Sequence, residues 1–358
     1  MDCFKILVIN PGSTSTKIAV YQGCESVFLK TLRHSAEQMA QFEDIASQFS
    51  FRKEVILNEL VQAEIDIQDF DAIVGRGGMV KPIESGVYEM NAALTADLKK
   101  GVLGQHASNL GGLIADDIAK NIPNARAFIA DPVVVDELQD VARVTGHPDM
   151  PRRSIFHALN QKAVAKNYAK EIERKYEDIN VIVAHLGGGI SVGAHLKGKI
   201  IDVNNALDGY GPFSPERAGT LPTGALIDAC YSGKYTYEEM RKIVNGKGGM
   251  VAHLGTNQAM EVEKKAKEGD AHNLLILQAM AYQIAKNIGA CAAVLKGEVD
   301  GIIITGGIAY DKIVTAYIKD MVGWIAPYKI YPGEDEMKAL AENGLAVLSG
   351  ETTCKVYE

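Results

Sequence analysis

The 358-residue sequence contains no apolar run that approaches the roughly 18–20 residues a membrane-spanning helix needs. Its longest candidate, residues 288–295, is closed off by Lys286 and Lys296, which is typical of a core helix. The N-terminal apolar stretch meets Pro11 too early for a secretion signal. We therefore expect a cytoplasmic protein that has no membrane partner.

Positive charge is also scarce. The sequence has 37 Lys and Arg against 45 Asp and Glu, a formal net charge of −8 at pH 7. This balance argues against a surface for nucleic acid or for an anionic membrane. A small anionic nucleotide is not excluded, because a few local cations, Mg²⁺ and backbone amides can dominate inside a cleft.

Cysteine is rare and shows no pattern. The five cysteines are odd in number and never spaced as metal-binding pairs, so we interpret them as reduced thiols. They are Cys3, Cys24, Cys230, Cys291 and Cys354. The remaining composition, 47% hydrophobic with 35 Gly, is that of an α/β protein long enough for two domains.

The most informative feature is a repeat. Residues 4–23 indicate a strand, a turn of small residues and a returning strand, and residues 181–198 repeat this order at a constant offset. In that register Asn10 falls on His185 and Gly12 falls on Gly187. A third β-rich run follows each copy. Two such hairpins, one in each half of the chain, predict two opposing phosphate-binding turns and hence a nucleotide-dependent phosphotransferase.

In the first copy the small residues allow the backbone to approach a phosphate group. We select Asn10, Ser13, Ser15 and Lys17 as phosphate-binding candidates, with Lys17 adding a point charge. The segment is not a P-loop, because the required glycine spacing is absent and a strand follows instead of a helix. The alternative is a hydrophobic hairpin with a convenient turn.

In the second copy Gly187, Gly188 and Gly189 are consecutive. Three glycines cost about 0.5–1 kcal/mol each in backbone entropy relative to alanine, which favours a ligand-binding role over a plain bulged hairpin. A further pair, Gly306 and Gly307 with Ile308, follows the buried run 301–305 and is suited to contact a nucleoside. Such pairs are common in α/β folds.

Charged candidates stand at predicted strand ends. Arg76 and Asp131 end the strands 72–76 and 125–131, at the sheet edge where α/β proteins bind ligands. His157 follows two arginines and favours stabilisation of phosphoryl charge, although a packed polar histidine is the simpler alternative. Asp131 and Glu334 are candidates for Mg²⁺, with helix caps or surface acids as the alternative.

The composition changes near residue 150, where prolines and two arginines precede a long helical pattern. We predict a first domain of residues 1–150 with about 338–358, and a second domain of 151–337. No low-complexity linker separates them.

The motifs together resemble the acetate and butyrate kinase family, within the superfamily of sugar kinases, heat-shock chaperones and actin. The resemblance covers essentially the whole chain. Its anchors, in chain order, are Asn10–Lys17, Arg76–Gly78, Asp131, Arg152–His157, His185–Gly189, Pro215–Gly219, Thr305–Gly307 and Gly333–Glu334. The stretches 75–78, 213–222 and 331–336 are more similar to the butyrate kinase branch.

The resemblance implies a two-domain actin-like ATPase fold, an α/β architecture of duplicated ribonuclease H-like βββαβαβα units with an interdomain active-site cleft. It also implies reversible in-line transfer of phosphate from ATP, with Mg²⁺, to a short-chain carboxylate, and a homodimer or larger homo-oligomer. Butyrate is the expected acid, with isobutyrate or other branched acids possible. Acetate or propionate kinases, a non-kinase actin-like ATPase and a phosphatase of this fold stay open as alternatives.

The resemblance assigns roles residue by residue. Asn10, Asp131 and Glu334 would hold the metal, and Arg76, His157 and His185 would act on the carboxylate or the phosphoryl group. Gly187–Gly189 would hold the β- and γ-phosphates, Gly306–Ile308 would contact the nucleoside, and Gly78, Phe156 and Pro215 would line the acid pocket.

Two departures from the family pattern affect these roles. Leu221 stands where acetate kinases have an arginine that acts on the phosphoryl group, and Arg217 is the candidate replacement. Gly78 stands where they have a valine, so we expect room for a longer acid.

Overall fold

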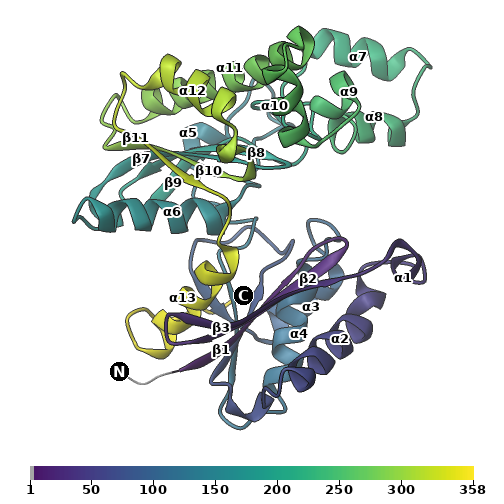
Figure 1. Cartoon of the computed structure of the whole chain (residues 1–358), viewed down its shortest axis with the longest axis vertical. Coiled ribbons are helices and arrows are strands. Elements are labelled where there is room, and N and C mark those ends of the chain that lie inside the picture. Colours follow the sequence, from purple (N-terminus) through teal and green to yellow (C-terminus); the bar gives the residue numbers. More distant parts are fainter. Residues whose placement is uncertain (1–3) are drawn as a thin grey trace. The chain divides into compact units, whose positions relative to one another are not determined.

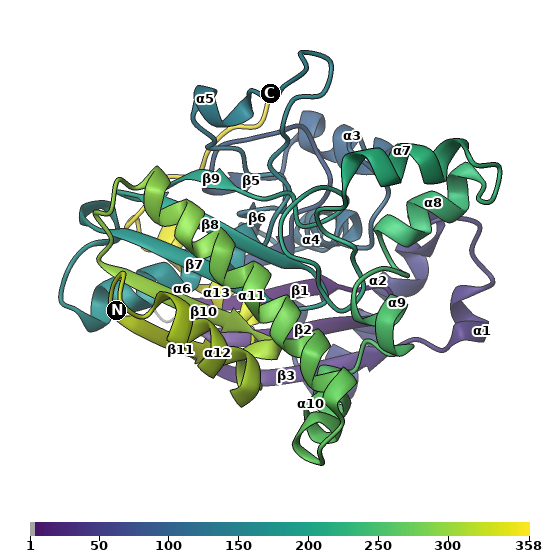
Figure 2. The ribbon, with the colours of Figure 1, turned by 90° about the horizontal axis from the view of Figure 1, so that it is seen from above.

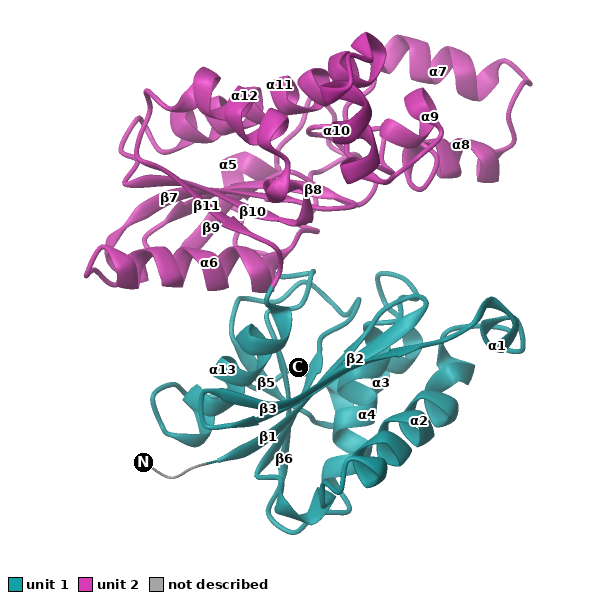
Figure 3. Ribbon diagram, in the orientation of Figure 1, with its two compact units in different colours: residues 1–135, 335–358 teal, residues 136–334 magenta. Residues whose placement is uncertain are grey.

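The computed structural model describes residues 4–358, which form two compact units. Unit 1 contains the chain up to Val135 and the C-terminal segment Asp335–Glu358, and unit 2 contains Asp136–Glu334 (Figure 3). Cys3 lies outside the described residues; the other four cysteines are free thiols. No helix within residues 4–358 is long and apolar enough to cross a membrane.

The unit boundaries differ from the predicted ones. The predicted first boundary, after residue 150, lies inside unit 2, because the chain joins the second sheet earlier. Gln139 N donates to Ile201 O at 3.0 Å, and Glu137 forms an ion pair with Lys162 at 2.8 Å. The predicted second boundary, after residue 337, falls inside the C-terminal helix, all of which belongs to unit 1.

Unit 1 is built on a six-stranded sheet of order β3-β2-β1-β4-β6-β5. β1 to β3 form an antiparallel meander, β1, β4 and β6 are parallel, and β5 pairs antiparallel with β6. The strands are β1 Lys5–Pro11, β2 Ser15–Gln22, β3 Glu25–Arg33, β4 Ala72–Arg76, β5 Val87–Glu89 and β6 Arg126–Ala130.

Helices cover both faces of this sheet. Val74 and Gly75 are adjacent on β4 and therefore face opposite sides; Gly344 packs against Val74, whereas Gly111 lies against Gly75. Figure 1 shows α13 on one face and α4, with α3 and α2 beside it, on the other. The helices are α1 Ala36–Met39, α2 Phe49–Gln62, α3 Ala92–Lys100, α4 Asn109–Ala119 and α13 Glu336–Leu348.

Unit 2 repeats the plan of unit 1, as the internal repeat predicts. Its five-stranded sheet has the order β11-β10-β7-β8-β9, with an antiparallel meander β7 to β9 and the parallel strands β7, β10 and β11. The strands are β7 Asn180–Leu186, β8 Ile190–Leu196, β9 Lys199–Val203, β10 Gly301–Gly306 and β11 Tyr328–Pro332.

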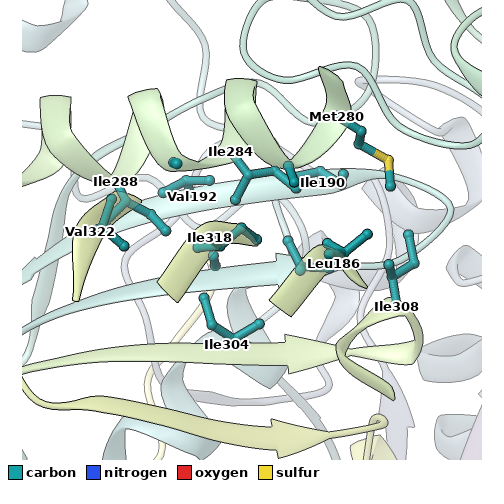
Figure 4. Close-up of a cluster of buried hydrophobic side chains, with 14 of the residues drawn as sticks. Leu186, Ile190, Val192, Met280, Ile284, Ile288, Ile304, Ile308, Ile318 and Val322 are labelled. Atoms are coloured by element: carbon teal, nitrogen blue, oxygen red, sulfur yellow. The ribbon is translucent and has the colours of Figure 1, made fainter. Parts of the chain in front are cut away.

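The core of unit 2 follows from the alternation along β7. Ile182, Ala184 and Leu186 join the cluster under α11 and α12, whereas Val181 and Val183 join the cluster under α6. Figure 2 shows α11 and α12 side by side, and Figure 4 shows their buried side chains against β8 and β10. These helices are α6 Ala158–Glu171, α11 Ala271–Val294 and α12 Lys312–Val322.

The shorter helices of unit 2 are α5 Asp140–Arg143, α7 Thr223–Tyr231, α8 Tyr237–Val244, α9 Met250–Leu254 and α10 Ala259–Lys267. The long helical pattern predicted after the two arginines forms α6, which ends at Glu171.

The contact between β4 and α4 gives a test of the fold. A Cβ on Gly75 would overlap the Gly111 carbonyl and lie 2.6 Å from Gly112 N. We expect Gly75→Ala to lower the free energy of unfolding by about 1–3 kcal/mol, because the helix must move away from the sheet. Chemical denaturation followed by circular dichroism measures it.

The matched control is Gly289→Ala on α11, where no atom lies within 4 Å of the added Cβ. Alanine there should be neutral or stabilise by up to about 1 kcal/mol, because glycine is a poor helix former. Equal stability losses in the two variants would contradict the close contact at Gly75.

Candidate functional site

In unit 1, three polar side chains meet at the carboxyl edge of the sheet. Asn10 stands near the end of β1, Arg76 ends the parallel neighbour β4, and Glu336 is the first residue of α13. Asn10 Nδ2 and an Arg76 terminal nitrogen both donate to Glu336 Oε2, each at 2.7 Å. The Arg76–Glu336 ion pair is largely shielded from solvent, so it holds the guanidinium beside Asn10.

Glu336 is a site residue that sequence reasoning missed. The segment Glu334-Asp335-Glu336 offers three neighbouring acids, and the prediction selected Glu334. Asp335 instead caps α13 by accepting from Lys338 N. Glu334 lies in unit 2, where its Oε1 is 3.1 Å from His185 Nε2. The local sequence pattern does not identify which of the three acids faces inward.

Asp131 directly follows β6, the neighbour of β4, as predicted. Its backbone has φ of +39°, which is uncommon for a residue other than glycine and is often found at functional sites. Its Oδ1 accepts from Ser85 Oγ at 2.6 Å and from Gly86 N at 2.9 Å. This carboxylate therefore also stabilises the segment that precedes β5.

The turn between β1 and β2 is closed by Gly12 N, which donates to Ser15 O at 2.7 Å. Ser13 and Lys17 are exposed and Ser15 is half-buried, so the turn is open to a ligand.

Gly78 differs from the expectation. A Cβ there would lie 2.6 Å from Asn109 Cα, so the space of the missing side chain is filled by α4 and offers no room for a longer acid.

In unit 2, the imidazoles of His157 and His185 stack, with ring centroids 3.7 Å apart and an angle of 9° between the planes. His157 precedes α6, and His185 is the last residue but one of β7, close to the glycine turn. His185 is buried, and its Nδ1 lies 2.8 Å from Asn160 Oδ1. The structure therefore brings both predicted histidines together beside the glycine turn.

A pocket of about 240 Å³ that opens to solvent lies in unit 2. Gly187 and Gly188 from the first glycine turn line it together with Gly307 and Ile308, so the structure brings the two predicted segments to one place. The other lining residues are Pro215, Glu216, Asn257, Gln258, Ala259 and Glu334.

Glycine is needed at both segments for steric reasons. A Cβ on Gly187 would lie 3.0 Å from His185 Nε2, and Gly306 has φ of +91° with the Leu186 backbone against it. Ile308, next to Gly307, packs into the core beside Leu186 (Figure 4). The turns can therefore approach a ligand closely only because side chains are absent.

Arg217 lies against Gly189, where an added Cβ would overlap its guanidinium. It donates to the Ala206 carbonyl, and burial lowers its pKa. The buried Nε of Arg217 has no hydrogen-bond partner among the described residues. Phe156 is buried, and neither Phe156 nor Gly189 lines the pocket.

A chain of buried hydrogen bonds leads away from His157. Its Nδ1 lies 2.9 Å from Ser191 Oγ, and Gln161 Nε2 lies 2.7 Å from the same oxygen. Gln161 Oε1 lies 3.0 Å from His195 Nε2, and His195 Nδ1 lies 2.8 Å from Tyr176 OH. Burial and Lys162 hold the pKa of His195 well below its usual range, so this ring is neutral.

The backbone carbonyl of Ser191 fixes the orientation of the Gln161 amide within this chain of hydrogen bonds. Ser191 O can only accept, so the Gln161 group 3.1 Å from it is the NH₂ group. That group also donates to Ser191 Oγ, which leaves the hydroxyl proton available to His157 Nδ1. We therefore expect neutral His157 to carry its proton on Nε2. Ser191 and Gln161 were not selected from the sequence.

Comparisons with known proteins point to the same family that the sequence motifs resemble. A model of the acetokinase family matches residues 148–322. The chain is 58% identical over 355 residues to butyrate kinase 2 of Clostridium acetobutylicum, covering 99% of each chain. It is 57% identical over 355 residues to butyrate kinase 1 of that organism, covering 99% of this chain and 100% of the relative.

Among solved structures, Porphyromonas gingivalis acetate kinase aligns with 96% of this chain and 100% of its own chain, with a TM-score of 0.75. The sequence identity is 20%, so this likeness shows a shared fold.

The orientation of the hydrogen-bond chain is testable without any ligand. In nitrogen-15-labelled protein, long-range spectra should show neutral His157 as the Nε2–H form, and Ser191→Ala should increase the Nδ1–H form because the donor to Nδ1 is lost. Ser232→Ala, at an exposed helix end, is the control and should leave His157 unchanged. A wild-type His157 protonated on Nδ1 would overturn the assignment.

Proposed function

The chain belongs to the acetate and butyrate kinase family, and on this premise we propose that it transfers the terminal phosphoryl group of ATP to butyrate, giving butyryl phosphate and ADP reversibly. The choice of butyrate rests on the two relatives named butyrate kinase, which match nearly the whole chain. The single structural observation that carries the proposal is the unit 2 pocket, where a glycine turn and the Gly307–Ile308 segment line one space.

The chemistry of the acceptor explains which residues are present. A carboxylate is already ionised at neutral pH, so the reaction needs no strong general base. The main obstacle is repulsion between two anions, which fixed cations and hydrogen-bond donors relieve. Arg76, held by Glu336, and the two stacked histidines provide such groups.

We assign the acid and the transferring phosphoryl group to the side chains of unit 1, and the nucleotide to unit 2. Gly187 and Gly188 would hold the β- and γ-phosphates through backbone amides, and Gly307 with Ile308 would contact the nucleoside. His157 would donate from Nε2–H to a phosphoryl oxygen, since Ser191 occupies its other nitrogen.

The donors in unit 1 suit Mg²⁺. Asn10 and Glu336 offer hard oxygen atoms, and Asp131 stands at the same sheet edge. Mg²⁺ keeps several of its water ligands and takes few protein ligands, so two or three such oxygens suffice. When bound, the metal would neutralise phosphate charge. We propose Glu336 beside Asn10 and Asp131 as its protein contacts.

We also propose that the enzyme acts in the cytoplasm as a homodimer or larger homo-oligomer. The family resemblance supports the oligomer. Exposed apolar side chains on α7 support it as well, because Ile227 and Tyr231 are 53% and 88% exposed.

A hydroxamate-trapping assay with ATP, Mg²⁺ and acids of two to five carbons tests the proposal. We expect acyl hydroxamate with butyrate at the highest kcat/KM, and weaker product with neighbouring acids, since one methylene contributes about 1–3 kcal/mol to discrimination. Acetate as the best acid would contradict the butyrate assignment. Loss of ATP without hydroxamate would indicate an ATPase.

The Arg76→Ala variant tests the charge at the sheet edge. We expect kcat/KM to fall by about 10²–10³-fold, the usual effect of removing one group that stabilises developing charge. Arg126→Ala is the matched control, because Arg126 begins the neighbouring strand β6 and pairs with Glu89. If both variants keep wild-type rates, Arg76 has no role in the reaction.

A further inference from the structure

The most unusual charge in the described chain is Arg52 on α2. Its side chain is 0% exposed, and no carboxylate within residues 4–358 pairs with it. Burying an unpaired charge costs several kcal/mol, so a protein keeps one only where something compensates.

All compensation in the structure comes from neutral oxygen atoms and one sulfur. The guanidinium donates to Ser15 O at 3.1 Å, Thr16 Oγ1 at 3.0 Å and Ser13 O at 3.1 Å. Its remaining donors reach Gln48 Oε1 at 3.0 Å and Met39 Sδ at 3.9 Å. Ser13 O lies in the turn between β1 and β2, and Ser15 O and Thr16 Oγ1 belong to the first two residues of β2.

These contacts orient the turn. The carbonyls of Ser13 and Ser15 point to the guanidinium, and in a trans peptide the following N–H points the opposite way. The amide of Thr14 therefore points away from Arg52, whereas Thr16 is buried in β2 between β1 and β3. Ser13 and Thr14 are exposed, so the outer side of the turn presents donors to solvent.

The buried ring of His34 adds no charge beside Arg52. It lies 2.9 Å from Thr16 Oγ1, and burial together with Arg52 lowers its pKa, which keeps it neutral. The turn thus stands over one full, unneutralised positive charge in a medium that screens it poorly.

We propose that Arg52 is a positioning residue for the phosphoryl group: its fork holds the Ser13–Thr16 turn, and its charge is balanced by a phosphate bound on the outer side. This inference rests on the proposed function, which makes the turn a phosphate site. Arg52 acts through the turn and does not touch the substrate itself.

The sharpest test neutralises Arg52 without removing it. Met39 is half-buried and close to the guanidinium, so Met39→Glu places a carboxylate beside the charge, and Met39→Gln is the neutral control of equal shape. Inorganic phosphate is titrated into labelled protein, and its Kd is taken from the amide signals of Thr14 and Ser15. We expect Met39→Glu to raise this Kd roughly tenfold while the thermal midpoint without phosphate is unchanged or higher. Met39→Gln should behave as wild type.

Substitution of Arg52 itself separates the effect of its positive charge from the effect of its planar guanidinium group. Arg52→Lys should keep part of the phosphate affinity, whereas Arg52→Met should lose it and raise the KM for acyl phosphate more than it lowers kcat. Lys53→Met removes the neighbouring cation, which pairs with Asp117, and should leave the Kd unchanged. If Arg52→Met does not fold, the comparison of Met39→Glu with Met39→Gln tests the inference.

The outcomes are distinct. Wild-type phosphate affinity in Met39→Glu and Arg52→Met, with only the thermal midpoint changed, would make Arg52 a structural residue and overturn the inference. An absence of phosphate-induced shifts at Thr14 and Ser15 in wild type would overturn it as well. A wild type that forms no acyl hydroxamate refutes the proposed function instead.

Discussion

Both units depend on a tight backbone-closed turn between the first two strands of their sheets. Gly12 N donates to Ser15 O at 2.7 Å in unit 1, and Gly187 N donates to Gly189 O at 3.0 Å in unit 2. Such turns form only where side chains are small, and they leave backbone donors uncovered at the sheet edge. Asn10 and His185 occupy matching places before the two turns, so each unit places one polar side chain beside its open backbone.

The two units use different groups to offset the negative charge of a phosphate. Unit 1 holds full charges: Arg76 is matched by Glu336, and Arg52 is matched only by dipoles. Unit 2 holds stacked imidazoles, one of which joins a chain of hydrogen bonds anchored at Ser191 O. Fixed charge and oriented dipoles both act strongly where water is excluded, because neither must reorganise when a phosphate arrives.

Much of the plan could be predicted from local pattern. The repeat, the strand ends at Arg76 and Asp131, and the two-domain actin-like fold are confirmed, because strand alternation and small-residue turns are local properties. Gly78 shows the limit. Its glycine suggested an open pocket, yet Asn109 of α4 fills that space, and no local pattern reports which neighbour stands opposite a missing Cβ.

The sequence by itself determined where the turns lie, which strands precede them and which reaction family the motifs match. Tertiary structure alone decided which of three neighbouring acids meets Asn10, which cation lies beneath the first turn, and which hydroxyl meets His157 Nδ1. The physical reason is distance along the chain. Glu336 and Asn10 are far apart in sequence, and only folding brings such partners within hydrogen-bond reach.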